Sequence, residues 1–342
     1  MTSTPPAPSQ PIFDKRPIVI RSSLWRAALG AVLGIIAATL IFGFGVATGV
    51  GGSIAAFSDG TLVERAPVRD GWAGQIIVIP IDGGIDDVTS RFVAECSREM
   101  AKDRPRAIVL RVDSGGGEVA ASDRIWRAVQ GWKAMGIPVV ASFGGTAASG
   151  GYYVACGCDQ IVAEPTCITG SIGVIAQMFT LKGLTDEVGI APVTIVASDS
   201  PRKDVANDMF RPWTDDDRQV VLGILDDAYR TFISRVHAGR TAQFKELDDV
   251  RQVADGSVYT ATQAKELGLV DSIGYLDDAI AEAERAAGIA KGTASVTRFT
   301  QPVSLFGSPF GASSPVLGLA GRDLRDVAAE LSQPRLMYQL NW

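Results

Sequence analysis

Residues 144–155 place one serine, Ser149, among four glycines, with an apolar run at 137–143 before it. A short apolar segment that can form a helix follows it. Small neighbours let a substrate backbone approach the hydroxyl, and the start of a helix favours developing negative charge. The pattern therefore fits a nucleophilic serine in a strand–turn–helix. It fits a tight loop of Gly and Ser equally well.

A serine nucleophile needs a base, and the sequence offers one histidine and several lysines. His237 lies near the end of a long expected helix, where most lone histidines are surface residues. A lysine can serve instead if burial lowers its pKa from about 10.4. The candidate is Lys203, which follows an apolar run at 193–197 and would lie at a strand end, where sites of α/β proteins gather. Lys182 is a further possibility, and composition alone favours a solvated loop lysine at 203.

Acyl transfer also needs amide donors for an oxyanion. Residues 115–117 are three glycines between an apolar run and an expected helix, so no side chain obstructs their N–H groups. Such a run can also bind phosphate, but this one lacks the Lys-Ser/Thr of a P-loop and the spacing of a dinucleotide fingerprint. A flexible turn is the ordinary alternative.

The composition argues against several other functions. The 342 residues carry a net charge of −6 and no basic block interleaved with aromatic residues, so nucleic acid is not an expected partner. Cys96, Cys156, Cys158 and Cys167 form no CxxC pair and lie far in sequence from the histidine. No metal site or other cofactor is therefore expected. We expect small buried thiols, although a disulfide is possible outside the cytoplasm.

The N-terminal part has the composition of a membrane anchor. Residues 27–57 hold no charged side chain, a run longer than the roughly 20 residues that span a bilayer. The apolar part of a cleaved signal peptide is only about 7 to 15 residues long. We therefore expect an uncleaved transmembrane anchor at 24–48. Four basic residues at positions 15–26 precede it, against two soon after it at 65 and 69, which puts the N-terminus inside.

The expected organisation follows from this topology. A cytoplasmic segment at 1–23 precedes the anchor, and a linker at 49–73 leads to an extracytoplasmic domain at 74–291. A tail rich in Ser, Pro and Gly, at 292–342, is expected to be loosely held. The protein would be a single-pass protein of the inner, or cytoplasmic, membrane.

Strands and helices alternate from residue 74 onward, which predicts an α/β fold with largely parallel strands. Strands are expected at 75–81, 107–112, 138–143, 160–163 and 193–197, and the glycine-rich runs 113–117 and 169–173 as loops. Helices are expected at 88–102, 119–135, 215–238 and 277–287, with a turn and helix at 258–268. Thr214 is the expected N-cap of the longest helix.

Several short motifs occur in the order seen in a known peptidase family. They are Asp113-Ser114-Gly-Gly-Gly-Glu118-Val119, Ala148-Ser149-Gly-Gly-Tyr152-Tyr153, Thr169-Gly170-Ser171-Ile172-Gly173-Val174, Lys203, Gly256-Ser257-Val258-Tyr259-Thr260, and residues 268–274. Over roughly residues 74–291 the sequence resembles signal peptide peptidase A, a family of membrane-anchored Ser/Lys serine peptidases with a ClpP/crotonase-like fold. The single copy of the motifs resembles the short form, which assembles as a ring of subunits.

The resemblance implies a role for each matched residue. Ser149 resembles the nucleophile, Lys203 the general base, and Ser171 the hydroxyl that holds the lysine amine. Gly116 and Gly150 resemble the oxyanion donors. The implied activity is cleavage of remnant signal peptides in the membrane after their release. Since tandem relatives take serine and lysine from different halves of the chain, we expect Ser149 of one subunit to face Lys203 of the next.

Two positions depart from the family pattern. Gly115 stands where the family usually has Pro, so the backbone of the glycine run has more conformational freedom. The sequence therefore leaves open which backbone amide faces the oxyanion. Arg202 stands where Tyr often precedes the lysine, and it would lower the pKa of the amine if it pointed toward it.

Two other functions stand beside the peptidase. A catalytically silent anchored scaffold on the same fold would organise membrane partners, and covalent labelling of Ser149 would separate it from an enzyme. A crotonase-like acyl-CoA enzyme would share the fold class, but an extracytoplasmic domain has no supply of CoA. The expected partners of the peptidase are peptide substrates, the membrane and further copies of the chain. Its groove, lined by glycine and apolar strands, should prefer small or apolar side chains.

Overall fold

The computed structural model describes residues 63–301 and 337–339. The expected cytoplasmic segment, the anchor at 24–48 and most of the tail lie outside these residues. By compactness the chain divides after Thr61, and all described residues belong to the second unit. Within residues 63–301, no helix combines the length and the apolar character needed to cross a bilayer.

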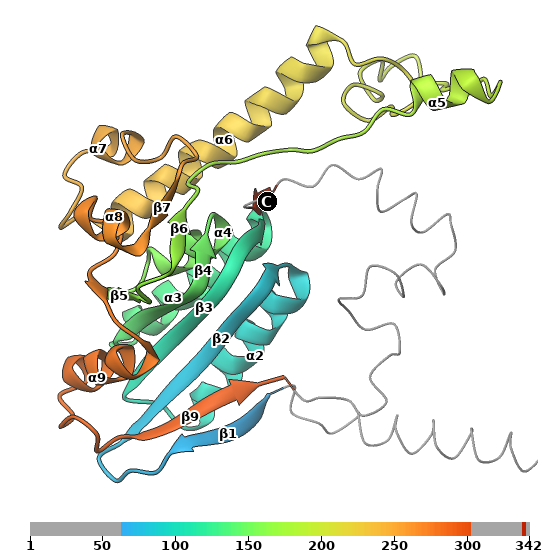
Figure 1. The fold of residues 1–342 in the computed structure, drawn as a ribbon. Coiled ribbons are helices and arrows are strands. Elements are labelled where there is room, and N and C mark those ends of the chain that lie inside the picture. The colour runs from blue at the N-terminus through green and yellow to red at the C-terminus, as the bar shows by residue number, and fades with distance from the viewer. Residues whose placement is uncertain (1–62, 302–336, 340–342) are drawn as a thin grey trace, which may run out of the picture. The chain divides into compact units, whose positions relative to one another are not determined.

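A mixed sheet with helices on both faces confirms the expected α/β class (Figure 1). Its order is β1-β9-β2-β3-β4-β5-β8, in which β1 is antiparallel to β9 and the other neighbours are parallel. A shorter strand, β6, pairs in parallel with the end of β4 and antiparallel with β7. The strands are β1 (Glu64–Arg69), β2 (Gln75–Ile85), β3 (Ala107–Glu118), β4 (Val139–Ala148), β5 (Gln160–Ala163), β6 (Ile168–Gly170), β7 (Val258–Thr260), β8 (Ser272–Ile273), β9 (Ser295–Thr300) and β10 (Met337–Gln339).

Two long helices lie side by side on one face of the sheet, and another covers the opposite face (Figure 1). The helices are α2 (Asp87–Lys102), α3 (Val119–Ala134), α4 (Gly150–Ala155), α5 (Lys182–Glu187), α6 (Asp215–Gly239), α7 (Leu247–Arg251), α8 (Ala261–Glu266) and α9 (Leu276–Ala286). The pair is α2 with α3, and α9 lies opposite them. This arrangement buries the central strands on both faces.

Alternate side chains of β2 enter different parts of the core. Ile77 and Ile79 belong to the cluster that includes Phe92 of α2, whereas Ile76 belongs to the cluster that includes Ile280 of α9. Successive side chains of a strand point to opposite faces, so a continuous apolar run indicates a strand covered on both sides. The apolar runs expected as strands at 75–81, 107–112, 138–143 and 160–163 lie in β2, β3, β4 and β5.

Several segments differ from the sequence expectation. Thr169 and Gly170, expected in a loop, belong to β6. The glycine run 113–117 continues β3 instead of forming a loop, because Gly116 and Gly117 pair with the end of β2. Residues 193–197 form no strand: Val193 and Ile195 are 81% and 89% exposed, and no described strand pairs with them. Lys203 therefore does not follow a strand. The sheet also extends beyond residues 74–291, since β1 belongs to it and β9 lies between β1 and β2.

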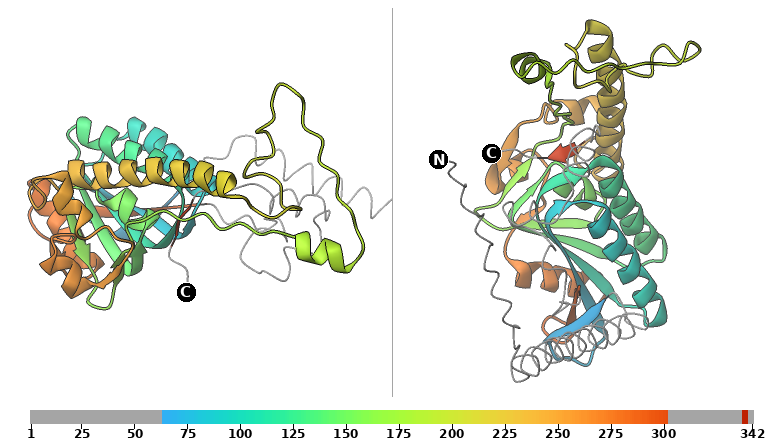
Figure 2. Two further views of the ribbon diagram at one scale, coloured as in Figure 1. Left: turned by 90° about the horizontal axis from the view of Figure 1, so that it is seen from above. Right: turned by 90° about the vertical axis from the view of Figure 1, so that its right-hand side faces the viewer.

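The segment between β6 and α6 leaves the sheet, and α6 returns to it (Figures 1 and 2). The 25 residues of α6 span about 37 Å at 1.5 Å per residue. Thr214 caps this helix as expected, and with Asp217 it forms a capping box. We call residues 175–225 the arm; it includes α5, several turns and the outer half of α6.

Candidate active site

Ser149 lies at the turn between β4 and α4, as the sequence predicts. Its φ and ψ are 53° and −114°, a left-handed conformation that is strained for any residue except glycine. The N–H of Ser149 donates to the carbonyl oxygen of Gly170 at 2.8 Å, and its own carbonyl accepts from the N–H of Tyr153 at 2.8 Å. Strained backbone held by its surroundings is typical of functional positions.

Ser171 lies beside this turn, because the hydrogen-bond partner of Ser149 is the residue before it. Its φ is also left-handed, at 50°, and its N–H donates to the carbonyl oxygen of Ser257 at 2.7 Å. Both serines are buried. The structure therefore brings together two of the three side chains that were predicted to act in catalysis.

Gly150 and Gly116 lie together at the same turn. A Cβ on Gly150 would lie 2.8 Å from Ser122 Oγ and 3.0 Å from the nitrogen of Gly117, so only glycine fits here without a shift of its neighbours. The N–H of Gly150 is at the first position of α4, where helical N–H groups have no intrahelical partner. The N–H of Gly116 donates to Ser114 Oγ at 3.0 Å. An oxyanion would therefore have to displace the Ser114 hydroxyl to reach the Gly116 amide.

Asp113 ties the ends of β3 and β4 together just before the serine turn. Its Oδ1 accepts from the N–H of Thr146 at 3.1 Å, and a Cβ on Gly144 would lie 2.7 Å from its Oδ2. Asp113 belongs to one of the sequence motifs, which does not indicate a role for it. Its position at the end of an apolar strand was the available signal.

The end of β3 that holds Gly115, Gly116 and Gly117 is here called the glycine strand. It pairs with β2 on one side and with a further strand on the other. Strand β10 pairs antiparallel with the end of β3, opposite Gly116, Gly117 and Glu118. Gly116 and Gly117 also pack on Gly150, next to Ser149. An extended peptide segment therefore fits along this side of the candidate site.

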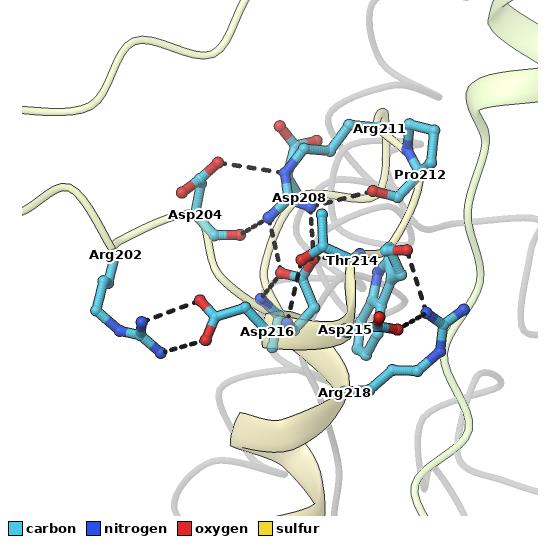
Figure 3. A network of polar contacts seen from close by, with 12 residues as sticks. Arg202, Asp204, Asp208, Arg211, Pro212, Thr214, Asp215, Asp216 and Arg218 are labelled. Atoms are coloured by element: carbon cyan, nitrogen blue, oxygen red, sulfur yellow. Dashed lines mark hydrogen bonds and ion pairs between the residues drawn. The ribbon is translucent and has the colours of Figure 1, made fainter.

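Lys203 lies in the arm and is exposed. It lines a hollow of about 450 Å³ together with Ile195, Asp204 and Phe210. The preceding Arg202 points toward the start of α6, where its guanidinium pairs with the carboxylate of Asp216 at 3.0 Å (Figure 3). In this structure the positive charge of Arg202 is therefore paired with the carboxylate of Asp216.

Helix α6 separates Lys203 from the Ser149 of the same chain. Near Ser149, Tyr153 packs on Phe232 of α6, with ring centroids 4.9 Å apart. Near Lys203, the partner of Arg202 is Asp216, at the other end of that helix. From residue 216 to residue 232 the helix rises about 24 Å. The structure thus brings Ser149, Ser171, Gly116 and Gly150 together, and it does not bring Lys203 to them within one chain.

The other side chains considered as bases have partners of their own. His237 Nε2 lies 3.2 Å from the carbonyl oxygen of Lys245, and Lys182 forms an ion pair with Asp186 inside α5. These contacts are those of surface residues. They give no support to either side chain as the base for Ser149.

The four cysteines are buried and free, as expected. Burial raises the pKa of Cys156 and that of Cys167 to about 12. These thiols are therefore poor nucleophiles at neutral pH. Among residues 63–301, no cluster of three His, Cys, Asp or Glu side chains could hold a metal ion.

Comparison with known proteins identifies the family. Residues 132–290 match the profile of Peptidase family S49. A Synechocystis sp. protein that carries a protease name is 35% identical over 223 residues, which cover 65% of this chain and 78% of that protein. The chain belongs to peptidase family S49. It is a serine peptidase of the signal peptide peptidase A group, as the sequence motifs predict.

Two further S49 relatives are longer than the matched region. Protease 4 of Salmonella typhi is 36% identical over 218 residues, which cover 61% of this chain and 34% of that protein. An Enterococcus faecium protein named signal peptide peptidase SppA is 33% identical over 189 residues, 55% of this chain and 53% of that protein. Among solved structures, a serine-to-alanine variant of the 1510-N membrane-bound stomatin-specific protease aligns with 62% of this chain and 86% of that chain. Its TM-score is 0.42 at 16% identity.

Proposed function

We propose that this S49 peptidase is a membrane-anchored endopeptidase with a Ser149/Lys203 dyad on a ClpP/crotonase-like fold. Its substrates are remnant signal peptides and other apolar peptides at the membrane. The observation that carries the proposal is the strained turn at Ser149, bonded to Gly170 and packed on the glycine strand. Among the serines of the described chain, Ser149 and Ser171 have a left-handed φ, and Ser149 is the one at the start of a helix, α4.

The proposed chemistry follows from these positions. Ser149 Oγ attacks the substrate carbonyl carbon while the neutral Lys203 amine takes its proton, and Ser171 holds that amine. The negative charge that develops on the carbonyl oxygen is stabilised by the N–H of Gly150 and, once it leaves Ser114, by that of Gly116. The leaving amine takes the proton from Lys203. Water then hydrolyses the ester on Ser149, with the lysine again acting as base.

The base comes from a neighbouring subunit in this proposal. Asp216, whose partner Arg202 is next to Lys203, lies about 24 Å along α6 from Phe232, the residue that contacts Tyr153. The same arm exposes ten large apolar side chains to solvent. An exposed apolar surface of this kind is typical of a protein–protein interface, and we infer that a second copy of the chain covers it. The ten side chains are Ile175, Phe179, Leu184, Val188, Ile190, Val193, Ile195, Phe210, Leu222 and Ile224. A ring of such contacts gives each Ser149 a Lys203, and an isolated subunit would be inactive.

The substrate binds as an added strand in the place that β10 takes along the end of β3. The pairing of β10 with Gly116 and Gly117 supports this, since it is the hydrogen-bonding geometry by which an extended peptide joins a sheet edge. Backbone bonds then provide affinity without regard to sequence. Because the adjoining wall is glycine, small or apolar side chains should be preferred, and cleavage only after Lys or Arg would contradict this.

The cellular setting belongs to the same proposal. The uncharged run at 27–57 anchors the chain in the inner membrane, with residues 1–23 in the cytoplasm and the peptidase outside. An anchor keeps the site next to apolar peptides left in the bilayer.

Two experiments on the full-length, detergent-solubilised protein test the proposed function. Ser149→Ala should abolish peptide hydrolysis and covalent labelling by a fluorophosphonate while the protein still folds and inserts. Labelling and turnover that persist in Ser149→Ala would reject the nucleophile. A wild-type protein that neither turns over peptides nor reacts with the probe would instead fit the scaffold alternative.

The shared site is tested by mixing two inactive variants. Ser149→Ala and Lys203→Ala subunits, co-assembled, should regain part of the activity, because some interfaces then combine an intact serine with an intact lysine. Mixed rings of the correct mass that stay inactive would place the dyad within one subunit.

A further inference from the structure

Within the arm, Arg211 forms an ion pair with Asp217, which lies in the first turn of α6. The Asp217 carboxylate is fully buried, and Arg211 donates to both of its oxygens, at 2.6 and 2.7 Å. The same carboxylate accepts from the N–H of Ala206 at 2.7 Å, and from the N–H and hydroxyl of Thr214 at 2.7 and 2.6 Å. A two-pronged contact between guanidinium and carboxylate fixes the direction of both groups as well as their distance.

The pair also holds the turn that carries Lys203. The guanidinium of Arg211 donates to the side chain of Asp204 at 3.2 Å and to its backbone carbonyl oxygen at 3.1 Å. Asp217 holds the N–H of Ala206. The chain is therefore held by hydrogen bonds at Asp204 and at Ala206, one and three residues beyond Lys203.

The backbone of this segment is strained at Ala206. Ala206 has a φ of 57°, a conformation that only glycine adopts without cost. The other residues in the described chain that share this property without being glycine are Ser149 and Ser171, both in the candidate site. Strained backbone persists only where the surroundings over-determine it. At Ala206 a bond to the buried Asp217 carboxylate supplies that constraint.

We propose that Arg211 and Asp217 are positioning residues for catalysis: they hold the strained turn at Ala206 and thereby fix where Lys203 projects from the arm. The inference rests on the proposed Ser149/Lys203 dyad. A base must come within hydrogen-bond distance of the nucleophile, and an error of about 1 Å can cost 10²-fold in rate. Lys203 is exposed and lies far along α6 from the main core, so this polar cluster replaces the packing that fixes most catalytic groups.

The test compares Asp217→Asn with Asp216→Asn in the full-length oligomer. Both changes remove one carboxylate charge from the first turn of α6, but Asp216 is exposed and its partner is the exposed Arg202. With an apolar peptide substrate, Asp217→Asn should lower kcat per assembled subunit by about 100-fold and leave KM within about twofold. Asp216→Asn should leave both constants within about twofold, as expected for an exposed pair.

A second change separates positioning from stability. Glycine adopts a φ of 57° without strain, so Ala206→Gly in the Asp217→Asn background should recover about tenfold in kcat. A lost helix cap would not be restored by a change at residue 206. A role limited to stability would lower the unfolding temperature and leave kcat per assembled subunit unmoved.

Three results would overturn the positioning role: wild-type kcat in Asp217→Asn, an equal loss in Asp216→Asn, or no recovery with Ala206→Gly. If Asp217→Asn does not assemble, Arg211→Lys replaces it, because lysine keeps the charge and loses the two-pronged contact. Lys203→Arg is measured in parallel. Full activity of Lys203→Arg would reject the dyad itself, whereas an inactive Lys203→Arg beside a fully active Asp217→Asn would reject the positioning role alone.

Discussion

The N–H of Ser149 donates to the carbonyl oxygen of Gly170 at 2.8 Å, and this bond joins the two turns on which the candidate site is built. It continues the parallel pairing of β4 with β6, whose last pair is Ala148 with Gly170. The positions of both hydroxyls, on Ser149 and Ser171, therefore follow from strand register. Changes to the glycines that allow this register should be more harmful than changes to glycines elsewhere.

Gly150→Ala tests how closely the serine turn must pack on the glycine strand. The new Cβ would lie 2.8 Å from Ser122 Oγ and 3.0 Å from the nitrogen of Gly117, so the turn must shift. We expect kcat/KM for an apolar peptide to fall by about 100-fold, the usual effect of a small misplacement. Gly131→Ala in α3 is the control, because its Cβ would meet no atom within 4 Å. Equal rates in the two variants would remove the argument for close packing.

Lys203→Arg tests the base. Arginine keeps the positive charge but does not give up its proton near neutral pH, so the variant should lose about 10³-fold or more in kcat. In the wild type the rate should rise with pH, since only the neutral amine accepts a proton from Ser149. Rates across pH 6 to 10 at saturating peptide would show both effects. A fully active Lys203→Arg enzyme would direct attention to His237 or Lys182.

The serine turn was predictable because its signal is local. A strand, two glycines, a serine and a short apolar helix are all visible within residues 137–155, and the structure has them in that order. The N-cap at Thr214 was predictable for the same reason. Its partner Asp217, three residues later, completes a spacing that is typical of a capping box and was available in the sequence.

Pairing between distant segments was not predictable from composition. Three consecutive glycines at 115–117 suggest a loop, yet they form a strand because the end of β2 supplies partners. Residues 193–197 alternate like a strand but find no partner edge in the described chain. Strand β9 is not evident from the sequence, because the Ser, Pro and Gly that follow it dominate the composition of the tail. The separation of Lys203 from Ser149 likewise depends on where α6 points.

The orientation of the chain in the membrane is checked by fusion reporters. A reporter fused at Thr2 should report the cytoplasm and one fused after Trp342 the extracytoplasmic side, because basic residues cluster before the uncharged run. The opposite pattern would contradict the charge argument. Release of a soluble domain would show instead that the apolar run is a cleaved signal.

The cysteines should be inert in the native protein. Burial raises the pKa of Cys156 and that of Cys167 to about 12, and it also raises the pKa of Cys96 and that of Cys158. Iodoacetamide at pH 8 should therefore leave the folded chain unmodified by mass and label all four thiols in urea. Two missing labels in urea would indicate a disulfide, and rapid labelling without urea would indicate an exposed thiol.

Acid should weaken the contact that Asp217 makes between the first turn of α6 and the loop before it. Hydrogen bonds from Arg211 hold the pKa of this carboxyl well below its usual range. A group with a lowered folded-state pKa stabilises the fold above its unfolded pKa, about 3.9, and loses that contribution as the pH falls toward the folded value.

At pH 5 to 8, Asp217→Asn should therefore cost about 3 kcal/mol in the free energy of unfolding, as is usual when one partner of a buried pair is removed. Urea unfolding at a series of pH values should show this difference shrink below about pH 4, where the Asp217 carboxyl of the unfolded chain begins to take up a proton that the folded chain does not bind. Asp216→Asn, at an exposed pair, should differ from wild type by less than about 1 kcal/mol throughout. A difference between wild type and Asp217→Asn that stays constant down to pH 2 would show that the ionised carboxylate is not what stabilises the arm.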